Sequence, residues 1–480
     1  MHSPQSALRA FIAFEEREQL FERQLLGVAY WQLIRHDVFR ATLEALGLAA
    51  RAHQRLEELP LSHWLGSQLR QLPRTVPRSF FTRLPRAELL VATHPRHLRY
   101  RGQFICPYAQ PLLWGTDVPR VQLTGHYQGR YFMPDAGEPT RYVDLGLVLS
   151  HAAFRVRELL GRGLPDHEIR ALGALADALR LQLGAAPPAA VLVRRARTAV
   201  LSSLGLRPWL EQLIERVSPR LVVDVVGYRL VNQLLTLCAR EHRIPVAELQ
   251  HGTIGAAHAG YNFAPARKPP AFPDHLLSFG EIWRELTPGL PLSAEAVHPV
   301  GYGWLALQAS AHVKTPPSRA RRVLFISQGD IGRELAALAV TLRAELSAER
   351  FELVYRLHPS EAPGWERSYP ELARSGIRVE LPMARELYAA QADADVQVGV
   401  YSTALLEGLA FGLDTCLVAL PGHEQLLFLQ ERGLARLAHD AGELRTLLND
   451  PRPASPQASA ALWAPSPPAR FAAFVAQQLG

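Results

Sequence analysis

Residues 394–420, ADVQVGVYSTALLEGLAFGLDTCLVAL, read as a strand, a polar turn, a helix and a second strand in immediate succession. The apolar run 395–400 is typical of a buried strand, and residues 404–411 have the Ala, Leu and Glu content of a helix, which Gly412 ends. Ser402-Thr403 places two hydroxyl groups where this helix begins. Such hydroxyls cap free backbone N–H groups, and the same N–H groups attract anions. The turn is therefore either an ordinary helix cap or a phosphate site.

The segment before this stretch alternates between strands and helices in the same way. Strands are expected at 323–327, 351–357 and 376–381, with a helix at 333–347. Such alternation is typical of a doubly wound parallel sheet. The basic, proline-containing segment 312–322 precedes it and is the best candidate for a linker between domains.

A second unit of strand, helix and strand is expected further upstream. Residues 221–226 and 244–249 are apolar strands, and residues 228–242 form the helix between them. A right-handed crossover brings Asp224, near the end of the first strand, and His251, just past the second, to one carboxyl edge of a parallel sheet.

The remaining segments complete the predicted α/β fold with a helical N-terminal extension. We expect helices in 1–75 and 150–218, short strands at 89–93 and 141–148, an irregular segment at 450–469 and a terminal helix at 469–479. The expected organisation is an N-terminal domain at 1–311, a linker at 312–322, a second domain at 323–455 and a tail with the terminal helix at 456–480.

Composition restricts the function classes. The chain has 480 residues and a formal net charge of +7, which suits an anionic substrate or membrane face but argues only weakly for nucleic acid. The three cysteines, Cys106, Cys238 and Cys416, form neither a CxxC pair nor a disulfide framework, so a reducing cytoplasm is the simplest location. No signal-peptide core and no apolar run of about 18 residues occurs, so we expect a soluble or peripheral protein.

Polar groups follow three strands of the C-terminal half, and they should converge on one crevice. Glycines there allow close approach of the backbone, a histidine can donate to a phosphate, and a glutamate one helical turn further on can accept from ribose hydroxyls or face solvent. The candidate donor-binding residues are Gln328, Gly329, Gly332, His358, Pro359, Ser402, Thr403 and Glu407.

The N-terminal half offers a separate set of polar residues. His251 ends an apolar strand and begins a loop rich in polar and flexible residues, and Asp224 interrupts the apolar run LVVDVV, where an unpaired carboxylate would be costly to bury. His251 and Asp224 are the candidate catalytic residues. The candidate acceptor-side residues are Gln250, Gly252, His258 and Tyr261.

One possible metal-binding motif is discounted, and several common nucleotide- and metal-binding motifs are absent from the sequence. Asp393-Ala394-Asp395 mimics a metal-binding DxD motif, but it lies at the amino end of a strand, away from the predicted crevice. There is no Walker A loop, GxGxxG fingerprint, HExxH motif or Cys/His cluster. We therefore expect neither a metal nor a cofactor. Nucleic-acid binding is also disfavoured, because the Arg-rich segments lack interleaved aromatic residues.

These residues resemble motifs of bacterial surface-polysaccharide transferases of the GT-B type over about residues 219–447. Capsule Kdo transferases, bacterial sialyl- and polysialyltransferases and CDP-glycerol glycerophosphotransferases carry a His-Pro motif and a Ser/Thr pair that hold the donor phosphate, which match His358-Pro359 and Ser402-Thr403. The His-Gly element of the glycerophosphotransferases, implicated with the acceptor, is similar to His251-Gly252. The Gln- and Gly-containing loop of Kdo transferases is similar to Gln328–Gly332, with a spacing that differs by one residue. The resemblance implies two Rossmann-like domains facing a cleft, with the acceptor side in the N-terminal domain, 1–311, and the nucleotide-donor side in the C-terminal domain, 323–455.

The leading hypothesis is a metal-independent glycosyltransferase that uses a nucleotide-activated, CMP-linked sugar as its substrate. The implied partner is a glycan or lipid-linked acceptor of capsule or lipopolysaccharide, at the inner face of the cytoplasmic membrane, where the Arg-rich segment 70–101 would meet anionic lipid. The alternatives are a CDP-polyol phosphotransferase of the teichoic-acid type, an enzyme like the non-hydrolysing UDP-GlcNAc 2-epimerases, and a non-catalytic scaffold. The epimerase needs no acceptor site, so the long N-terminal region speaks against it.

Overall fold

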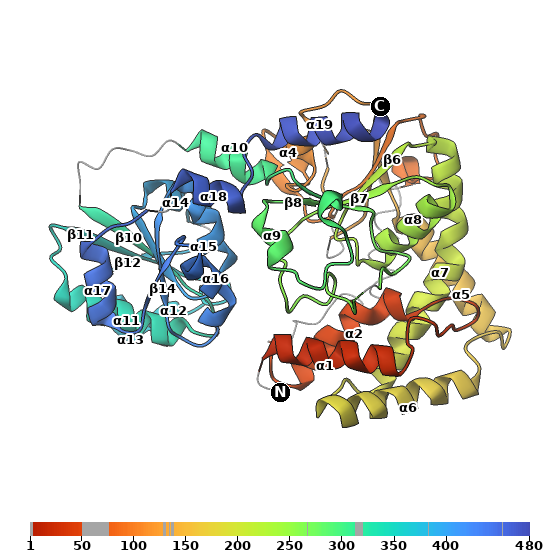
Figure 1. The fold of residues 1–480 in the computed structure, drawn as a ribbon, viewed down its shortest axis with the longest axis horizontal. Helices are drawn as coiled ribbons and strands as arrows, with labels where there is room; N and C mark the ends of the chain where they lie inside the picture. The colour runs from red at the N-terminus through yellow and green to blue at the C-terminus, as the bar shows by residue number, and fades with distance from the viewer. Residues whose placement is uncertain are drawn as a thin grey trace. The chain divides into compact units, whose positions relative to one another are not determined.

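The structure is a computed structural model that describes residues 3–49, 76–127, 131–133, 135, 139–265, 267–312, 320–382, 384–453 and 455–480. The chain divides into two compact units. The first comprises Met1–Gly303 and Pro467–Gly480, and the second comprises Trp304–Ser466. Each unit contains a parallel sheet with helices packed on it (Figure 1). The predicted α/β fold with two Rossmann-like sheets and an N-terminal helical region is therefore confirmed.

The sheet of the first unit has the strand order β5-β4-β1-β6-β7-β8-β9 among the described residues, and every pairing is parallel. The predicted strand–helix–strand unit forms its centre, with Asp224 of β6 in register with Glu248 of β7. The strands are β1 (Leu89–Ala92), β4 (Arg120–Thr124), β5 (Thr140–Tyr142), β6 (Leu221–Val225), β7 (Val246–Leu249), β8 (His275–Ser278) and β9 (Val297–Pro299), and β2 (Leu98–Tyr100) and β3 (Gln103–Ile105) form a separate hairpin.

Helices cover both faces of this sheet (Figure 1). One face packs on the N-terminal helices and on α7 and α8, and the other packs on α4 and α19. The bounds are α1 (Pro4–Arg17), α2 (Trp31–Ala45), α4 (Gln110–Leu113), α5 (Asp144–Leu159), α6 (Asp166–Leu183), α7 (Ala189–Val217), α8 (Leu230–Glu241), α9 (Ile282–Glu285) and α19 (Pro467–Leu479). In the described part of the chain, no helix combines the length and the apolar character needed to cross a membrane.

The terminal helix α19 belongs to the first unit, although the second unit precedes it in sequence. Its buried residues Phe471, Phe474 and Val475 pack against the apolar side chains of β1 and β6. The Arg470 guanidinium also donates to the carbonyl oxygen of Pro299 at 3.3 Å. The chain therefore returns to the first sheet after completing the second.

The second unit has the strand order β12-β11-β10-β13-β14-β15 among the described residues, again with parallel pairings throughout. The strands are β10 (Arg321–Ile326), β11 (Phe351–Arg356), β12 (Arg378–Glu380), β13 (Val396–Gly399), β14 (Asp414–Val418) and β15 (Arg436–Ala438). The helices are α10 (Gly303–Ala311), which begins in the first unit, α11 (Gly332–Glu345), α12 (Trp365–Ser368), α13 (Pro370–Arg374), α14 (Leu387–Asp393), α15 (Thr403–Gly408), α16 (Leu427–Glu431), α17 (Ala441–Asn449) and α18 (Pro456–Leu462).

The stretch 394–420 has the predicted structure. Strand β13 ends at Gly399, Ser402 caps α15 by accepting from the Ala404 N–H at 3.3 Å, and Gly412 ends the helical segment with φ +67°. A Cβ atom at Gly408 would overlap the buried amide of Gln397, so glycine lets the helix lie close to the strand.

Some predicted elements are wrong or lie outside the description. Residues 144–148 belong to α5 and not to a strand, because the helix already begins at Asp144, whose carboxylate in the first turn favours a helix start. The segment 450–469 is not irregular throughout, since Ser455 caps α18 and Pro456 occupies its first turn. In the predicted helical region 1–75, residues 50–75 lie outside the description, as does much of the expected linker 312–322. Residues 70–75 of the Arg-rich segment 70–101 also lie outside the description.

Candidate active site

The carboxyl edge of the first sheet brings together residues from several strand ends. Tyr228 follows β6, and His251 follows β7, the neighbouring strand. Between β6 and Tyr228, a Cβ atom on Gly227 would lie 2.6 Å from Oε2 of Glu248. Glycine is therefore required here for the Glu248 carboxylate to approach the loop.

A chain of hydrogen bonds connects Glu248 to His251. The Gly227 N–H and the Tyr261 hydroxyl both donate to Oε1 of Glu248, at 2.8 and 2.6 Å. The Tyr261 oxygen lies 3.4 Å from Nδ1 of His251, and the Tyr228 hydroxyl lies 3.0 Å from Nε2. Because the Tyr261 proton points to Glu248, its oxygen accepts from Nδ1–H. Nε2 of His251 then carries the lone pair and accepts from Tyr228.

Burial keeps His251 neutral. Its pKa is lowered to about 4, first by burial and then by the neighbouring His36 and Arg229. A neutral imidazole whose Nε2 accepts a hydrogen bond from a hydroxyl group can also take a proton from that group. The predicted catalytic histidine thus has the protonation state that a general base needs.

Asp224 and Glu248 form a buried pair of carboxyl groups on adjacent strands. Burial is the largest cause that raises both pKa values, that of Glu248 to about 7 and that of Asp224 well above its usual range, and Glu248 adds to the effect on Asp224. Both carboxyl oxygens of Asp224 lack a hydrogen-bond partner among the described residues, whereas Glu248 accepts two hydrogen bonds. Of the two, Asp224 is therefore the carboxyl group whose charged form has the less favourable surroundings.

The other predicted acceptor-side residues shape the loop that follows β7. Gln250 donates to the Gly252 carbonyl oxygen at 2.8 Å and accepts from the Phe279 N–H at 2.8 Å, so it fixes the turn after the strand. The His258 ring packs against Tyr261, with ring centroids 4.8 Å apart. Tyr261 itself is the middle of the hydrogen-bond chain. No hydrogen bond of the described residues connects Asp224 to His251.

The structure adds residues that the sequence reasoning did not name. Glu248 starts the hydrogen-bond chain, Tyr228 ends it, and His36 of α2 stacks on the Tyr228 ring with centroids 4.2 Å apart. His94, after β1, lies near Tyr108, whose ring is 6.2 Å from that of His251. Burial, followed by Arg229 and His251, lowers the pKa of His94 to about 3. The signals were present, because Glu248 interrupts an apolar strand and His94 directly follows one.

The N-terminal helices support this edge of the sheet through one buried ion pair. Arg35 of α2 contacts Glu15 of α1 at 2.6 Å, and both side chains are almost fully buried. The same guanidinium donates to the backbone carbonyl oxygens of Ala259 and Asn262, in the loop that carries Tyr261. Helices α1 and α2 are thereby anchored directly to the candidate active site.

The carboxyl edge of the second sheet holds the predicted donor-binding residues. Gln328, after β10, accepts from the Tyr401 N–H at 3.2 Å and so connects two strand ends. Thr403 is exposed at the start of α15. His358, after β11, is also exposed, and its Nδ1 lies 2.7 Å from the Ser360 hydroxyl. Pro359 follows it in the same exposed turn.

Glu361 organises the loop around His358. Its carboxylate accepts from the His358 N–H at 2.7 Å, from Ser327 at 2.9 Å and from Tyr369 at 2.6 Å. A Cβ atom at Gly332 would overlap this carboxylate, so the predicted glycine admits Glu361 to the start of α11. The negative charge stabilises the positive end of that helix.

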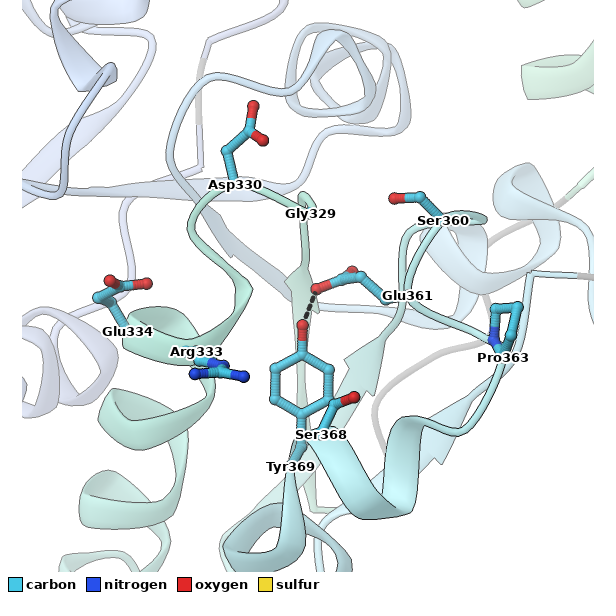
Figure 2. Close-up of a pocket in the computed structure, with 9 residues that line it drawn as sticks. All are labelled: Gly329, Asp330, Arg333, Glu334, Ser360, Glu361, Pro363, Ser368 and Tyr369. Atoms are coloured by element: carbon cyan, nitrogen blue, oxygen red, sulfur yellow. Dashed lines mark hydrogen bonds between the residues drawn. The ribbon is translucent and has the colours of Figure 1, made fainter. Parts of the chain in front are cut away.

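A polar cavity of about 340 Å³ lies beside Glu361 (Figure 2). Figure 2 shows the Tyr369 hydroxyl directed at Glu361, with Arg333 and Glu334 on the first turn of α11. Of the predicted donor-binding residues, Gly329 lines this cavity. The lining is Gly329, Asp330, Arg333, Glu334, Ser360, Glu361, Pro363, Ser368 and Tyr369. Its three carboxylates and one guanidinium suit hydroxyl groups better than a phosphate.

Glu407 is a partly buried carboxyl group that interacts with a neighbouring helix. It accepts a hydrogen bond from Tyr388 of α14. Burial raises its pKa to about 7 despite that hydrogen bond. At neutral pH it is therefore poised between its acid and carboxylate forms.

The two carboxylates of the DxD-like segment are engaged at the amino end of β13, one in an ion pair and the other in a hydrogen bond with a backbone N–H group. Asp393 contacts Arg322 at 3.1 Å, and Asp395 accepts from the Arg322 N–H at 2.9 Å. Among the described residues, no group of three or more His, Cys, Asp and Glu side chains has the arrangement of a metal site.

No family model matches the chain, and no curated protein matches it in sequence. Solved structures with a similar course of the chain include a UDP-GlcNAc 2-epimerase from Methanocaldococcus jannaschii, at 9% identity, with 82% of this chain and 99% of that chain covered and a TM-score of 0.47. The UDP-GlcNAc 2-epimerase from Neisseria meningitidis bound to UDP-GlcNAc has 11% identity, coverage of 82% and 99%, and a TM-score of 0.47. A glycosyltransferase from Streptomyces nogalater has 14% identity, coverage of 82% and 95%, and a TM-score of 0.40. Likeness at this level does not identify a reaction or a substrate for this chain.

Proposed function

We propose that this chain is a metal-independent glycosyltransferase that moves a sugar from a nucleotide-activated donor to a hydroxyl group of a glycan. The observation that carries the proposal is the hydrogen-bond chain from Glu248 through Tyr261 to His251. It holds a neutral imidazole whose Nε2 lone pair faces the Tyr228 hydroxyl, at the sheet edge where ligands of parallel α/β folds bind.

In the proposed reaction, His251 acts as the general base. The acceptor O–H bond breaks, and its proton passes to Nε2 of His251, directly or through the Tyr228 hydroxyl. The acceptor oxygen forms a bond to the anomeric carbon, and the bond from that carbon to the phosphate oxygen breaks. The electron pair of the broken bond leaves with the nucleotide. The imidazolium that forms is stabilised by Tyr261 and, behind it, by the Glu248 carboxylate.

We assign the donor nucleotide to the second unit. Ser402 and Thr403 at the start of α15 and the exposed His358 offer hydrogen-bond donors to a phosphate. Glu407 is assigned to the ribose hydroxyls, in exchange for its contact with Tyr388. Gln328, Gly329 and Gly332 are assigned to the neighbouring loop, which Gln328 connects to Tyr401 and in which Gly329 and Gly332 admit Ser360 and Glu361 close to the backbone.

The identity of the donor and acceptor rests on the motifs of the sequence. The resemblance of His358-Pro359 and Ser402-Thr403 to capsule Kdo transferases and bacterial sialyltransferases favours a CMP-linked sugar. The same resemblance favours a capsule or lipopolysaccharide acceptor, which is reached from the inner face of the cytoplasmic membrane. We therefore propose a peripheral association with that membrane.

A thermal-shift comparison of CMP, CDP, UDP and GDP tests the donor assignment. A ligand at about a hundredfold excess over its Kd stabilises the folded state by about 2.7 kcal/mol, which is enough to rank the bases. We expect the largest shift with CMP and no loss of the shift in EDTA. A shift that EDTA abolishes and Mg²⁺ restores would contradict a metal-independent donor site.

Product analysis with the best nucleotide sugar then separates transfer from its alternatives. Glycosyl transfer releases the nucleotide only when an acceptor glycan is present, and no donor phosphorus enters the glycan. A polyol phosphotransferase would leave phosphate in the product, and an epimerase would change the sugar without releasing the nucleotide. Either of the last two results would overturn the proposed reaction.

A further inference from the structure

Exposed apolar side chains gather on helix α5 of the first unit, which lies beside α7 (Figure 1). Val156 is 56% exposed, Leu159 is 87% exposed and Leu160 is 65% exposed, and Leu149, about two to three turns before them, is 43% exposed. At 3.6 residues per turn these positions fall on one face of the helix, together with the exposed Ala152. We call this face the α5 surface.

The opposite side of α5 is fixed to the protein core. A Cβ atom on Gly205 of α7 would lie 2.7 Å from Cβ of Ser150, and one on Gly146 would lie 3.1 Å from Leu206. Gly205 lets α7 approach the backbone of α5, and Gly146 leaves room for the side chains of Leu206 and Phe80. The exposed apolar face is therefore presented on a rigid support and is not a consequence of a loosely held helix.

The charges that border the α5 surface are positive. Arg155 and Arg157 flank the apolar face on its two sides by the helical repeat, and the exposed Arg162 follows the helix. The acidic side chain in this part of α5, Glu158, points away from solvent and pairs with Arg155 and with Arg197 of α7. An apolar strip between arginines is the pattern of a helix that lies in the headgroup region of an anionic bilayer.

We propose that the α5 surface docks this protein onto an anionic lipid membrane, with Leu159 and Leu160 entering the headgroup boundary and the arginines meeting lipid phosphates. The charge favours lipid over a second copy of the chain, because two such surfaces would bring like charges together. The proposal deepens the membrane association suggested above and does not depend on the nucleotide site.

Vesicle co-sedimentation of the full chain tests the proposal. We expect binding to vesicles that contain phosphatidylglycerol, little binding to pure phosphatidylcholine, and release as salt is raised. The double variant Leu159→Ser/Leu160→Ser should weaken partition into anionic vesicles by about tenfold or more. Arg155→Gln/Arg162→Gln should weaken it and reduce its dependence on salt.

Matched control variants come from α6. Leu181 is as exposed as Leu159, at 89%, but it lies near the far end of α6, 15 residues or about 22 Å along the helix from its first residue, Asp166. The variant Leu181→Ser should therefore bind vesicles as the natural chain does. Arg180→Gln controls for the loss of charge. Every variant should keep its melting temperature and its thermal shift with nucleotide, because surface substitutions rarely change stability by more than about 0.5 kcal/mol.

Three results would overturn the proposal. The natural chain could fail to bind anionic vesicles at low salt, or Leu159→Ser/Leu160→Ser could bind them as well as the natural chain. The third result is a dimer, measured by sedimentation velocity, that the same double variant converts to a monomer without any binding to vesicles. That result would identify the α5 surface as a subunit interface.

Discussion

Glu248 is a charged residue inside an apolar strand, and the structure explains why this position holds one. Its carboxylate accepts from a backbone N–H and from Tyr261, so the negative charge is stabilised although the side chain is 1% exposed. Through Tyr261, the carboxylate decides which nitrogen of His251 carries the proton. In the proposed reaction, Glu248 orients His251, the general base, and does not contact the substrate.

Replacing Tyr261 by Phe tests this orientation. The substitution removes the hydroxyl between Glu248 and His251, so Nδ1–H loses its acceptor and the other tautomer becomes accessible. We expect kcat to fall by about tenfold to a hundredfold, as when a histidine loses its orienting partner, with nucleotide affinity unchanged. Steady-state kinetics with a saturating donor measure the effect. An unchanged kcat would show that Tyr261 does not act through His251.

Glu407 provides a pH-dependent test at the residue scale. Its pKa is raised from 4.5 to about 7 in the folded protein, so between these values the folded state binds more protons than the unfolded state. Stability from this group is therefore fully present below about pH 4.5 and is lost as the pH rises through about 7.

Glu407→Gln keeps an acceptor for Tyr388 but removes the titration. We expect the free energy of unfolding of the natural chain, relative to Glu407→Gln, to fall by on the order of 2–3 kcal/mol between pH 4.5 and pH 8. Urea unfolding at several pH values measures the difference. A difference that does not change with pH would mean that Glu407 titrates normally.

At the scale of elements, the buried pair Glu15 and Arg35 anchors the N-terminal helices. Arg35 donates two hydrogen bonds to the Glu15 carboxylate, and the indole N–H of Trp31 of α2 donates a third at 2.7 Å. The guanidinium also lies 4.2 Å from the centroid of the Phe263 ring. Helices α1 and α2 are thus part of the first unit's core and position the loop that carries Tyr261.

Removing one charge of the Glu15–Arg35 pair should lower the free energy of unfolding more than removing both charges. Arg35→Met leaves a buried carboxylate unpaired, and we expect a loss of about 3–5 kcal/mol in the free energy of unfolding. The double variant Glu15→Gln/Arg35→Met should recover part of that loss. A double-mutant cycle by urea unfolding measures the coupling, and additive effects would contradict a shared buried pair.

Helices and strands with a strong apolar periodicity could be predicted from the sequence. Those whose bounds depend on helix caps or on burial between neighbouring strands could not. The alternating strands and helices of the second unit have long apolar runs between polar turns, and they appear where the pattern indicates. Strand β4 was missed because its residues, RVQLT, mix polar and apolar types and become buried only between β1 and β5. The extent of α5 was missed because its first turn is as apolar as a strand.

The candidate sites were predictable only where one residue stands out from its neighbours. His251 could be found because it ends a strand, and the same rule would have found His94. The contacts of His36 with Tyr228 and of Arg35 with the loop that carries Tyr261 could not be found, because they join residues more than 190 positions apart in the sequence. Tertiary packing alone brings them to the carboxyl edge of the first sheet.

At the scale of the whole molecule, the two candidate histidines belong to different units. His251 belongs to the first unit, where it is held neutral in a network of side chains. His358 belongs to the second unit, in an exposed turn beside Ser360. Transfer needs a base for the acceptor and hydrogen-bond donors for the leaving phosphate, and these two functions should be separable by mutation.

The most direct test is to measure nucleotide affinity and transfer rate in His251→Ala and His358→Ala, with Tyr261→Phe beside them. We predict that His251→Ala keeps its affinity for the nucleotide and loses transfer by about 10²–10⁴-fold, as expected for a lost general base. His358→Ala should weaken both, because a charge-assisted hydrogen bond to phosphate contributes about 1.5–3 kcal/mol. If His251→Ala abolished nucleotide binding, or retained nearly full transfer activity, the assignment of base and donor site to separate units would be contradicted.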